Sequence, residues 1–160
     1  AINKLAETNN CSVFRSAVGE INVVNKMNEI NSELGGEGNG GVILRECHMG
    51  RDSLVGATMV LNRMSFSKSS LSEIHSLLPQ FEIVKDKIDL QDVDVDNAIQ
   101  KVSILFDDAE MSDLDGIKFS WNDRWVHLRK SNTEPIMRIY SEAPNRNKAL
   151  KLVEKIKSVI

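Results

Sequence analysis

The chain contains no long apolar run: none of its hydrophobic stretches approaches the roughly 20 residues that a membrane-spanning helix requires. It also has no excess of positive charge, since 20 lysines and arginines stand against 23 aspartates and glutamates, a formal net charge of −3. Binding to nucleic acid would therefore require a local basic patch, and the sequence shows no obvious one. We accordingly expect neither a membrane nor a nucleic acid among the partners of this chain.

Cysteine is scarce as well. Cys11 and Cys47 are the only two, and no signal-peptide pattern accompanies them. This usage is typical of free thiols in a reducing cytoplasm rather than of a disulfide framework, although a single bridge is compatible with the sequence. The chain begins at Ala1 without a methionine, which indicates a fragment or a processed product.

The composition that remains is that of an ordinary globular protein. Apolar residues make up 41% and charged residues 27% of the chain, which excludes a disordered or collagen-like polypeptide. A length of 160 residues allows one large domain or two small ones, and either could bury an apolar core.

Helical and strand-like patterns alternate in the first half of the chain. A stripe of apolar residues with helical spacing runs into two glycines, which we expect to end the helix, and a strand candidate follows at residues 42–44. Aspartate and serine then provide caps for a second helix, and a capping box predicts a short third helix before Pro79. The stripe consists of Val23, Met27, Ile30 and Leu34, and the two glycines are Gly35 and Gly36. The caps are Asp52 and Ser53, and the capping box is Ser70 with Glu73.

After Pro79 the composition becomes more polar and acidic. We therefore place a domain boundary between Pro79 and Leu90, which gives domains at residues 1–82 and 83–160.

The second half predicts a small α+β domain, a sheet packed by two helices. A helical stripe is followed by three strand candidates and a final amphipathic helix that starts near Arg146. Asn122 and Asp123 are turn formers, so the first two strands should form a hairpin. The first stripe consists of Val95, Ile99, Val102 and Phe106, and the strands are residues 117–121, 125–129 and 136–143.

Hydrogen-bond donors gather in the loop before the last predicted strand. A phosphate dianion is held best by guanidinium forks supplemented by hydroxyl, amide and backbone N–H donors, and this loop has that set. Pro135 should stiffen the turn, so that less entropy is lost on binding. The candidate phosphate ligands are Arg129, Ser131, Asn132, Thr133 and Arg138.

A simpler reading of the same loop is an exposed polar turn whose two arginines pair with Glu134 and Glu142. Counting donors does not decide between the two readings.

The string RKSNTEPIMR, residues 129–138, closely resembles the phosphate-binding loop in the C-terminal domain of the α-D-phosphohexomutases. This family comprises phosphoglucomutases, phosphomannomutases and phosphoglucosamine mutases. Its loop has an arginine, any residue, SNTEP or SGTEP, and a second arginine shortly after.

The stretch GGEGNGG, residues 35–41, resembles the sugar-binding loop of the same family. The resemblance implies that Glu37 and Asn39 bind hydroxyls of the hexose, with Gly38 between them letting the backbone approach the ring. The glycines also match the dinucleotide pattern GxGxxG. However, that pattern should follow a strand and open a helix, whereas here a helix precedes and a strand follows. A plain glycine turn would leave the glutamate and the asparagine unexplained.

Two further stretches occur in the family's order. FRSAVGE, residues 14–20, resembles the segment before the helix, with Ser16 in place of the usual threonine, and GRDSLVGA, residues 50–57, resembles the turn into the next helix. Gly19 and Glu20 stand where some members contact substrate. The resemblance therefore implies a partial third domain of the α/β class, with a mixed sheet and helices, followed by a complete fourth domain.

The resemblance also implies what this chain does not carry. The first two domains, with the phosphoserine loop and the aspartate-rich loop that holds Mg²⁺, would lie in the missing N-terminal part of the same protein. Asp92, Asp94 and Asp96 alternate, but they match neither that loop nor an EF-hand, and a linker that caps the following helix explains them better. We expect no metal site and no catalytic residue in this chain.

The activity implied for the parent protein is the interconversion of a hexose 1-phosphate and a hexose 6-phosphate through a bisphosphate intermediate. The alternative is a stand-alone, non-catalytic module that binds phosphosugars. The wording of the motifs favours prokaryotic phosphoglucosamine or phosphomannose mutases, but no residue identifies the sugar.

Overall fold

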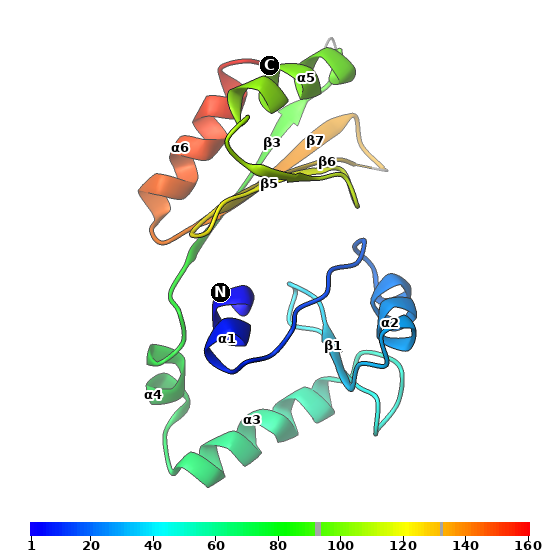
Figure 1. The fold of residues 1–160 in the computed structure, drawn as a ribbon, viewed down its shortest axis with the longest axis vertical. Coiled ribbons are helices and arrows are strands. Elements are labelled where there is room, and N and C mark those ends of the chain that lie inside the picture. The colour runs from blue at the N-terminus through cyan, green and yellow to red at the C-terminus, as the bar shows by residue number, and fades with distance from the viewer. Residues whose placement is uncertain (92–93, 132) are drawn as a thin grey trace. The chain divides into compact units, whose positions relative to one another are not determined.

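The computed structural model describes residues 1–91, 94–131 and 133–160. The chain divides into two compact units, Ala1–Pro79 and Gln80–Ile160 (Figure 1). In the described residues, the first unit has a sheet of two strands and the second a sheet of five. These elements confirm the expected fold class, α/β in the first half and α+β in the second. The sheet of the first half, expected to be mixed, is an antiparallel pair of strands in the described residues.

The first unit contains a short antiparallel hairpin, and two of its helices pack on it. Gly35 of the first strand pairs with Ile43 of the second, and the side chain of Ile43 is fully buried. The elements are α1 (Ile2–Thr8), α2 (Glu20–Glu29), β1 (Leu34–Gly36), β2 (Val42–Leu44), α3 (Ser53–Ser67) and α4 (Leu71–Ser76).

Both predicted helix caps in this unit are confirmed. The Asp52 carboxylate accepts hydrogen bonds from the backbone N–H groups of Leu54 and Val55 and so begins α3. Ser70 and Glu73 form the reciprocal capping box of α4. Each cap satisfies N–H groups that have no partner inside the helix.

The first predicted helix is wrong at both ends. It starts earlier, at Glu20, and it ends at Glu29, because Asn31 takes a left-handed φ of 52° and turns the chain away. Leu34, expected on the helix, instead pairs with Leu44 in the hairpin. Gly35 does not end a helix: a Cβ there would overlap the side chain of Met27, so glycine lets β1 pack closely on α2.

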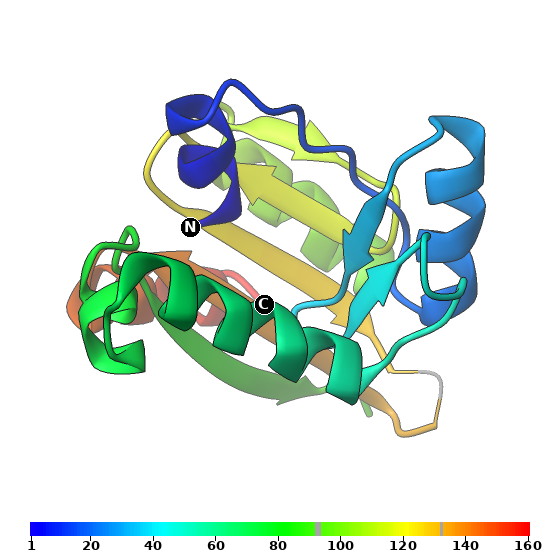
Figure 2. The ribbon, with the colours of Figure 1, turned by 90° about the horizontal axis from the view of Figure 1, so that it is seen from below.

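The second unit consists of a five-stranded antiparallel sheet with α5 and α6 on one side of it (Figures 1 and 2). The strand order is β3-β7-β6-β5-β4. The elements are β3 (Glu82–Asp89), α5 (Val95–Leu105), β4 (Glu110–Ser112), β5 (Ile117–Ser120), β6 (Trp125–Lys130), β7 (Ile136–Ala143) and α6 (Arg146–Lys157).

Strict alternation along the central strands builds the core of this unit. Every second residue of β7 is buried under the helices, and the residues between them lie on the opposite face of the sheet. Arg129 and Arg138 belong to that opposite face. The core contains Val84, Val102, Phe106, Phe119, Val126, Leu128, Met137, Ile139, Ala143, Ala149, Leu152, Val153 and Ile156.

The three predicted strands and both predicted helices of this unit are confirmed, with ends that differ by a residue or two. The two edge strands, β3 and β4, were not predicted. In β3 the charged run Lys85, Asp86 and Lys87 masks the alternation, because an edge strand pairs on one side only and tolerates charge. The polar stretch that suggested a domain boundary is therefore in large part a strand.

Both cysteines, Cys11 and Cys47, are free, as predicted, and both are exposed. None of the described helices combines the length and the apolar character that crossing a membrane requires.

Candidate functional site

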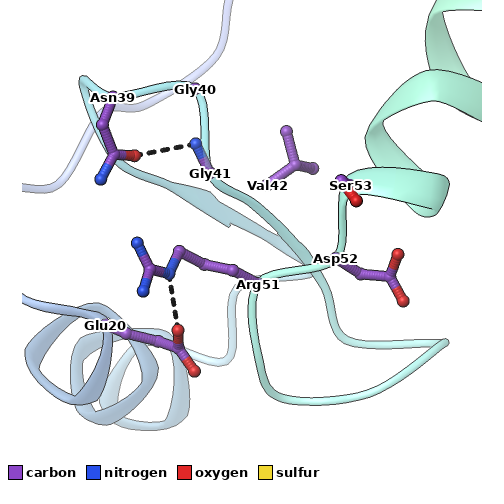
Figure 3. A pocket seen from close by; sticks show the side chains of 8 residues that line it. All are labelled: Glu20, Asn39, Gly40, Gly41, Val42, Arg51, Asp52 and Ser53. Carbon is purple, nitrogen blue, oxygen red and sulfur yellow. Dashed lines mark hydrogen bonds and ion pairs between the residues drawn. The ribbon is translucent and has the colours of Figure 1, made fainter.

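A pocket of about 560 Å³ opens in the first unit, where the β1–β2 turn, the start of α2 and the start of α3 meet (Figure 3). Two of the predicted binding residues, Glu20 and Asn39, line it. The full lining is Glu20, Asn39, Gly40, Gly41, Val42, Arg51, Asp52 and Ser53.

Arg51 joins two acidic side chains from different parts of the sequence at this pocket. Its Nε donates to Glu20 Oε2 at 2.6 Å (Figure 3), and its Nη1 lies 2.9 Å from Glu37 Oε2. The hydrogen bond from Arg51 is the main reason that the pKa of Glu20 is lowered, and the same bond raises the pKa of Arg51. At neutral pH both Glu20 and Arg51 are therefore charged.

Glu37 retains capacity to accept hydrogen bonds. Its side chain is only 12% exposed, and in the described structure its buried Oε2 has the ion pair with Arg51 but no hydrogen bond of ordinary geometry. A carboxylate offers about four acceptor positions, so one ion pair leaves several for hydroxyl donors.

The turn that carries Glu37 has a closely defined backbone. Glu37 N donates to Gly41 O at 3.0 Å, and Gly40 N donates to Glu37 O at 3.1 Å. Gly40 has a φ of 95°, which favours glycine, and a Cβ on Gly41 would overlap the side chain of Arg51. Asn39 Oδ1 accepts from Gly41 N at 3.0 Å, whereas Gly38 has open space around its Cα.

Gly19 is the residue immediately before α2, with a φ of 121°. Its conformation orients Glu20, the first residue of α2. The carboxylate of Glu20 then accepts a hydrogen bond from Arg51. The structure thus links Glu20 and Glu37 through Arg51 and places Asn39 on the same pocket.

The loop in the second unit joins β6 to β7, and its two arginines are direct cross-strand partners. Arg129 and Arg138 therefore share one face of the sheet, with side chains 31% and 36% exposed. Arg129 Nη1 lies 3.1 Å from Asp115 Oδ2, and Arg138 Nη2 lies 3.7 Å from Glu134 Oε2.

The loop is tied to the end of the sheet by backbone hydrogen bonds. Ser131 N donates to Ile136 O at 2.9 Å, and Leu90 N, just after β3, donates to Pro135 O at 2.9 Å. Ser131 is 8% exposed, and its Oγ lies 3.4 Å from both the backbone N and the Oγ1 of Thr133. These groups are therefore gathered within one short turn.

The remaining predicted ligand of this loop, Asn132, lies outside the described residues. The alternative reading expected pairs with Glu134 and Glu142. The pair of Arg138 with Glu134 is present but long at 3.7 Å, whereas Glu142 accepts a hydrogen bond from Trp125 Nε1 at 3.1 Å.

Asp115 was missed by sequence reasoning. Its carboxylate pairs with Arg129 of β6, and its backbone oxygen is hydrogen-bonded to Nε2 of His127, which also lies on β6. Gly116 follows with a φ of 70°, and a Cβ there would overlap the backbone oxygen of Leu128. The Asp-Gly dipeptide is a common turn signal and could have indicated this corner.

We expect Gly116→Ala to destabilise the chain by about 1–3 kcal/mol through its left-handed backbone conformation alone, with the overlap on Leu128 adding to this. Chemical denaturation of the chain measures the effect. Gly38→Ala is the matched control, because Gly38 has no atom within 4 Å of a built Cβ and no positive φ. Equal stability of the two variants would contradict the role assigned to Gly116.

Arg51 was the second residue that the sequence did not single out. It lies in GRDSLVGA beside the capping Asp52, but its two partners are far away along the chain, 31 residues in the case of Glu20. The pKa of Asp52 itself is lowered, mainly by the hydrogen bond from the backbone of Val55.

Within residues 1–91, 94–131 and 133–160 there is no group of three or more His, Cys, Asp or Glu side chains that could hold a metal ion. Asp92 lies outside the described residues. Asp94 caps α5, accepting from Asn97 N at 3.2 Å, which agrees with the prediction of a capping role.

Comparison with known families identifies the class of protein. The protein-family model described as phosphoglucomutase/phosphomannomutase, alpha/beta/alpha domain III, matches residues 1–81. The model of the phosphoglucomutase/phosphomannomutase C-terminal domain matches residues 83–159. The chain belongs to the phosphoglucomutase/phosphomannomutase family, and it corresponds to the C-terminal part of its members.

Individual relatives agree with this assignment. Over 96% of its length the chain is 33% identical to a phosphoglucomutase/phosphomannomutase of Thermococcus kodakarensis, of which it covers 34%. Over 97% it is 31% identical to a phosphoglucosamine mutase of Methanococcus aeolicus, of which it covers 35%. The chain thus spans about a third of the length of these curated relatives.

The fold is similar to that of a solved structure as well. A phosphoglucomutase/phosphomannomutase family protein from Burkholderia thailandensis superposes with a TM-score of 0.71 at 22% identity, over 90% of this chain and 31% of that protein.

Proposed function

We propose that this chain is the C-terminal part of a phosphohexomutase, an intramolecular phosphotransferase that interconverts hexose 1-phosphate and hexose 6-phosphate through a phosphoserine and a bisphosphate intermediate. The chain supplies groups that bind the sugar and the phosphate, and the catalytic serine belongs to the N-terminal domains. The observation that carries the proposal is the cross-strand pair of Arg129 and Arg138 beside the hydroxyl-bearing turn at Ser131 and Thr133.

The proposed phosphate site consists of Arg129, Ser131, Asn132, Thr133 and Arg138. Two guanidinium groups on one face of the sheet can donate to different oxygens of the same dianion. The hydrogen bonds from Ser131 and Leu90 hold the turn in place before a ligand arrives, which reduces the entropy lost on binding.

The proposed sugar site consists of Glu37, Asn39 and Gly38, with Gly19 and Glu20 as further contacts. The buried oxygen of Glu37 supports this role, since it has an ion pair but no ordinary hydrogen bond in the described structure. Arg51 orients the carboxylate of Glu37, and Glu20 in turn restrains Arg51.

These groups act by position rather than by chemistry. Phosphoryl transfer depends mainly on alignment and charge stabilisation, so contacts far from the transferred group contribute to kcat as well as to KM. The Mg²⁺ that the family implies would stabilise the transferred phosphoryl group. The described residues have no cluster suited to hold it, and we place it on the missing N-terminal domains.

The names of the relatives from Thermococcus kodakarensis and Methanococcus aeolicus refer to different sugars. Glucose, mannose and glucosamine phosphates differ mainly at C2. No residue described here is assigned to that position.

We propose a cytoplasmic location, which the two free thiols at Cys11 and Cys47 support.

The test is an isomerisation assay with glucose 1-phosphate, a bisphosphate activator and Mg²⁺. The full-length protein should turn over and this chain alone should not, because it would contain neither the phosphoserine nor the metal site. Clear turnover by the chain alone would overturn the assignment.

Calorimetry separates the alternative, a stand-alone phosphosugar-binding module. A dedicated module should bind a hexose phosphate tightly without further domains, whereas this chain should bind it weakly or not at all.

A further inference from the structure

A third cationic residue stands in register with the two loop arginines. In the sheet, Lys87 of β3 is the direct partner of Arg138 on β7, and Arg138 is the direct partner of Arg129 on β6. Direct partners in antiparallel strands project to the same face, with adjacent strands about 4.8 Å apart. Lys87, Arg138 and Arg129 therefore form a row of three positive charges, called here the cationic row.

The charges of the cationic row are not fully compensated. Like charges directly opposite each other destabilise a sheet. Arg129 has Asp115 at 3.1 Å and Arg138 has Glu134 at 3.7 Å, whereas no ion pair to Lys87 occurs in the described part of the chain. Lys87 thus makes no ion pair in the described residues, and Asp89 lies two residues further along the same face of β3. An ammonium group without an ion pair can attract an anion.

The cationic row lies at the phosphate loop. Two residues beyond Lys87, Asp89 is the strand partner of Ile136, and Leu90 N donates to Pro135 O at 2.9 Å. The end of β3 is thereby fixed alongside the turn between Arg129 and Arg138. Lys87 therefore has a defined place near the loop although it is more than 40 residues away from it in the sequence.

We propose that Lys87 is a further phosphate-binding residue, which supplies a positive charge that makes no ion pair within the described residues and so favours a phosphate monoester dianion at this loop. The inference rests on the proposed function, because it concerns the same anion site. Arg129 and Arg138 give directed hydrogen bonds but are partly neutralised by Asp115 and Glu134. The ammonium group of Lys87 acts mainly through its charge, since it is compact and carried on a flexible stem.

The experiment compares four variants of the full-length protein, Lys87→Met, Lys87→Arg, Lys85→Met and Arg138→Met, by titration with inorganic phosphate and with glucose 6-phosphate. Lys85 is the matched control, because it lies on the same strand and the same face as Lys87 but two residues further from the loop. Its Nζ is 5.5 Å from the ring centroid of Tyr140. In the three methionine variants, the new side chain keeps most of the apolar stem.

We expect Lys87→Met to weaken binding roughly two- to fivefold, as for loss of an exposed charge contact, with Lys85→Met unchanged. The loss should shrink at high salt, and Lys87→Arg should restore affinity. If Lys87→Met and Lys85→Met behave alike while Arg138→Met binds poorly, this inference fails and the proposed function stands. If Arg138→Met binds normally, the proposed function fails.

A structural role for Lys87 predicts a different result. Removing one of three neighbouring like charges should leave the melting temperature of the protein unchanged or slightly higher, whereas loss of a structural contact should lower it. Weaker binding together with a lower melting temperature would therefore contradict the proposal.

Discussion

Arg138→Ala is expected to weaken hexose phosphate binding by the full-length protein roughly tenfold to a hundredfold, since a hydrogen bond to a charged group contributes about 1.5–3 kcal/mol. In the described structure the guanidinium group has only a long ion pair with Glu134, at 3.7 Å, so most of its donors are available to a ligand. Isothermal titration with glucose 1-phosphate and glucose 6-phosphate measures the loss.

Arg124→Ala is the control for this experiment. Arg124 precedes β6 at the end of the strand that is remote from the loop, where it pairs with Asp123 at 3.0 Å and lies over the ring of Trp121. Its removal should leave phosphosugar affinity unchanged. Unaltered affinity in Arg138→Ala would show that the loop does not bind phosphate.

Glu37→Gln should lower the affinity for the sugar about tenfold, because a carboxylate accepts hydrogen bonds from hydroxyls roughly twice as strongly as a neutral amide. The substitution preserves shape but also removes one of the two anionic partners of Arg51. Affinity for inorganic phosphate should be unaffected, since the phosphate carries no ring hydroxyls. Comparing kcat/KM for hexose phosphate with the affinity for inorganic phosphate therefore isolates the sugar contact.

The matched control is Glu29→Gln, which removes an exposed ion pair with Lys26 on α2. An exposed pair of this kind contributes little to stability, and no change in activity is expected. A Glu37→Gln enzyme with the activity of Glu29→Gln would remove the basis for a sugar site at this turn.

The features that sequence reasoning predicted well are those decided locally. The capping box at Ser70 and Glu73 and the cap at Asp52 depend on backbone groups within three residues. The alternation in β7 survives in the sequence because the strand is central and one face is fully buried.

The features that it missed depend on distant partners. Strand β1 is three residues long and glycine-rich, and its place is set by packing on Met27. Asp115 and Arg51 become parts of the candidate sites only through arginine pairs across 14 and 31 residues. The assignment of ligands to these sites stays a prediction, because their geometry allows binding without identifying what is bound.

Strand β3 has a consequence for the solution behaviour of this chain. An edge strand exposes unpaired backbone groups that can recruit a strand from another molecule, and lysines along the edge oppose such pairing by repulsion and by the cost of stripping their water. Lys85 and Lys87 lie on β3, which pairs with β7 alone in the described sheet. We therefore expect the same lysines that conceal the strand in the sequence to oppose edge-to-edge association of this strand with other molecules.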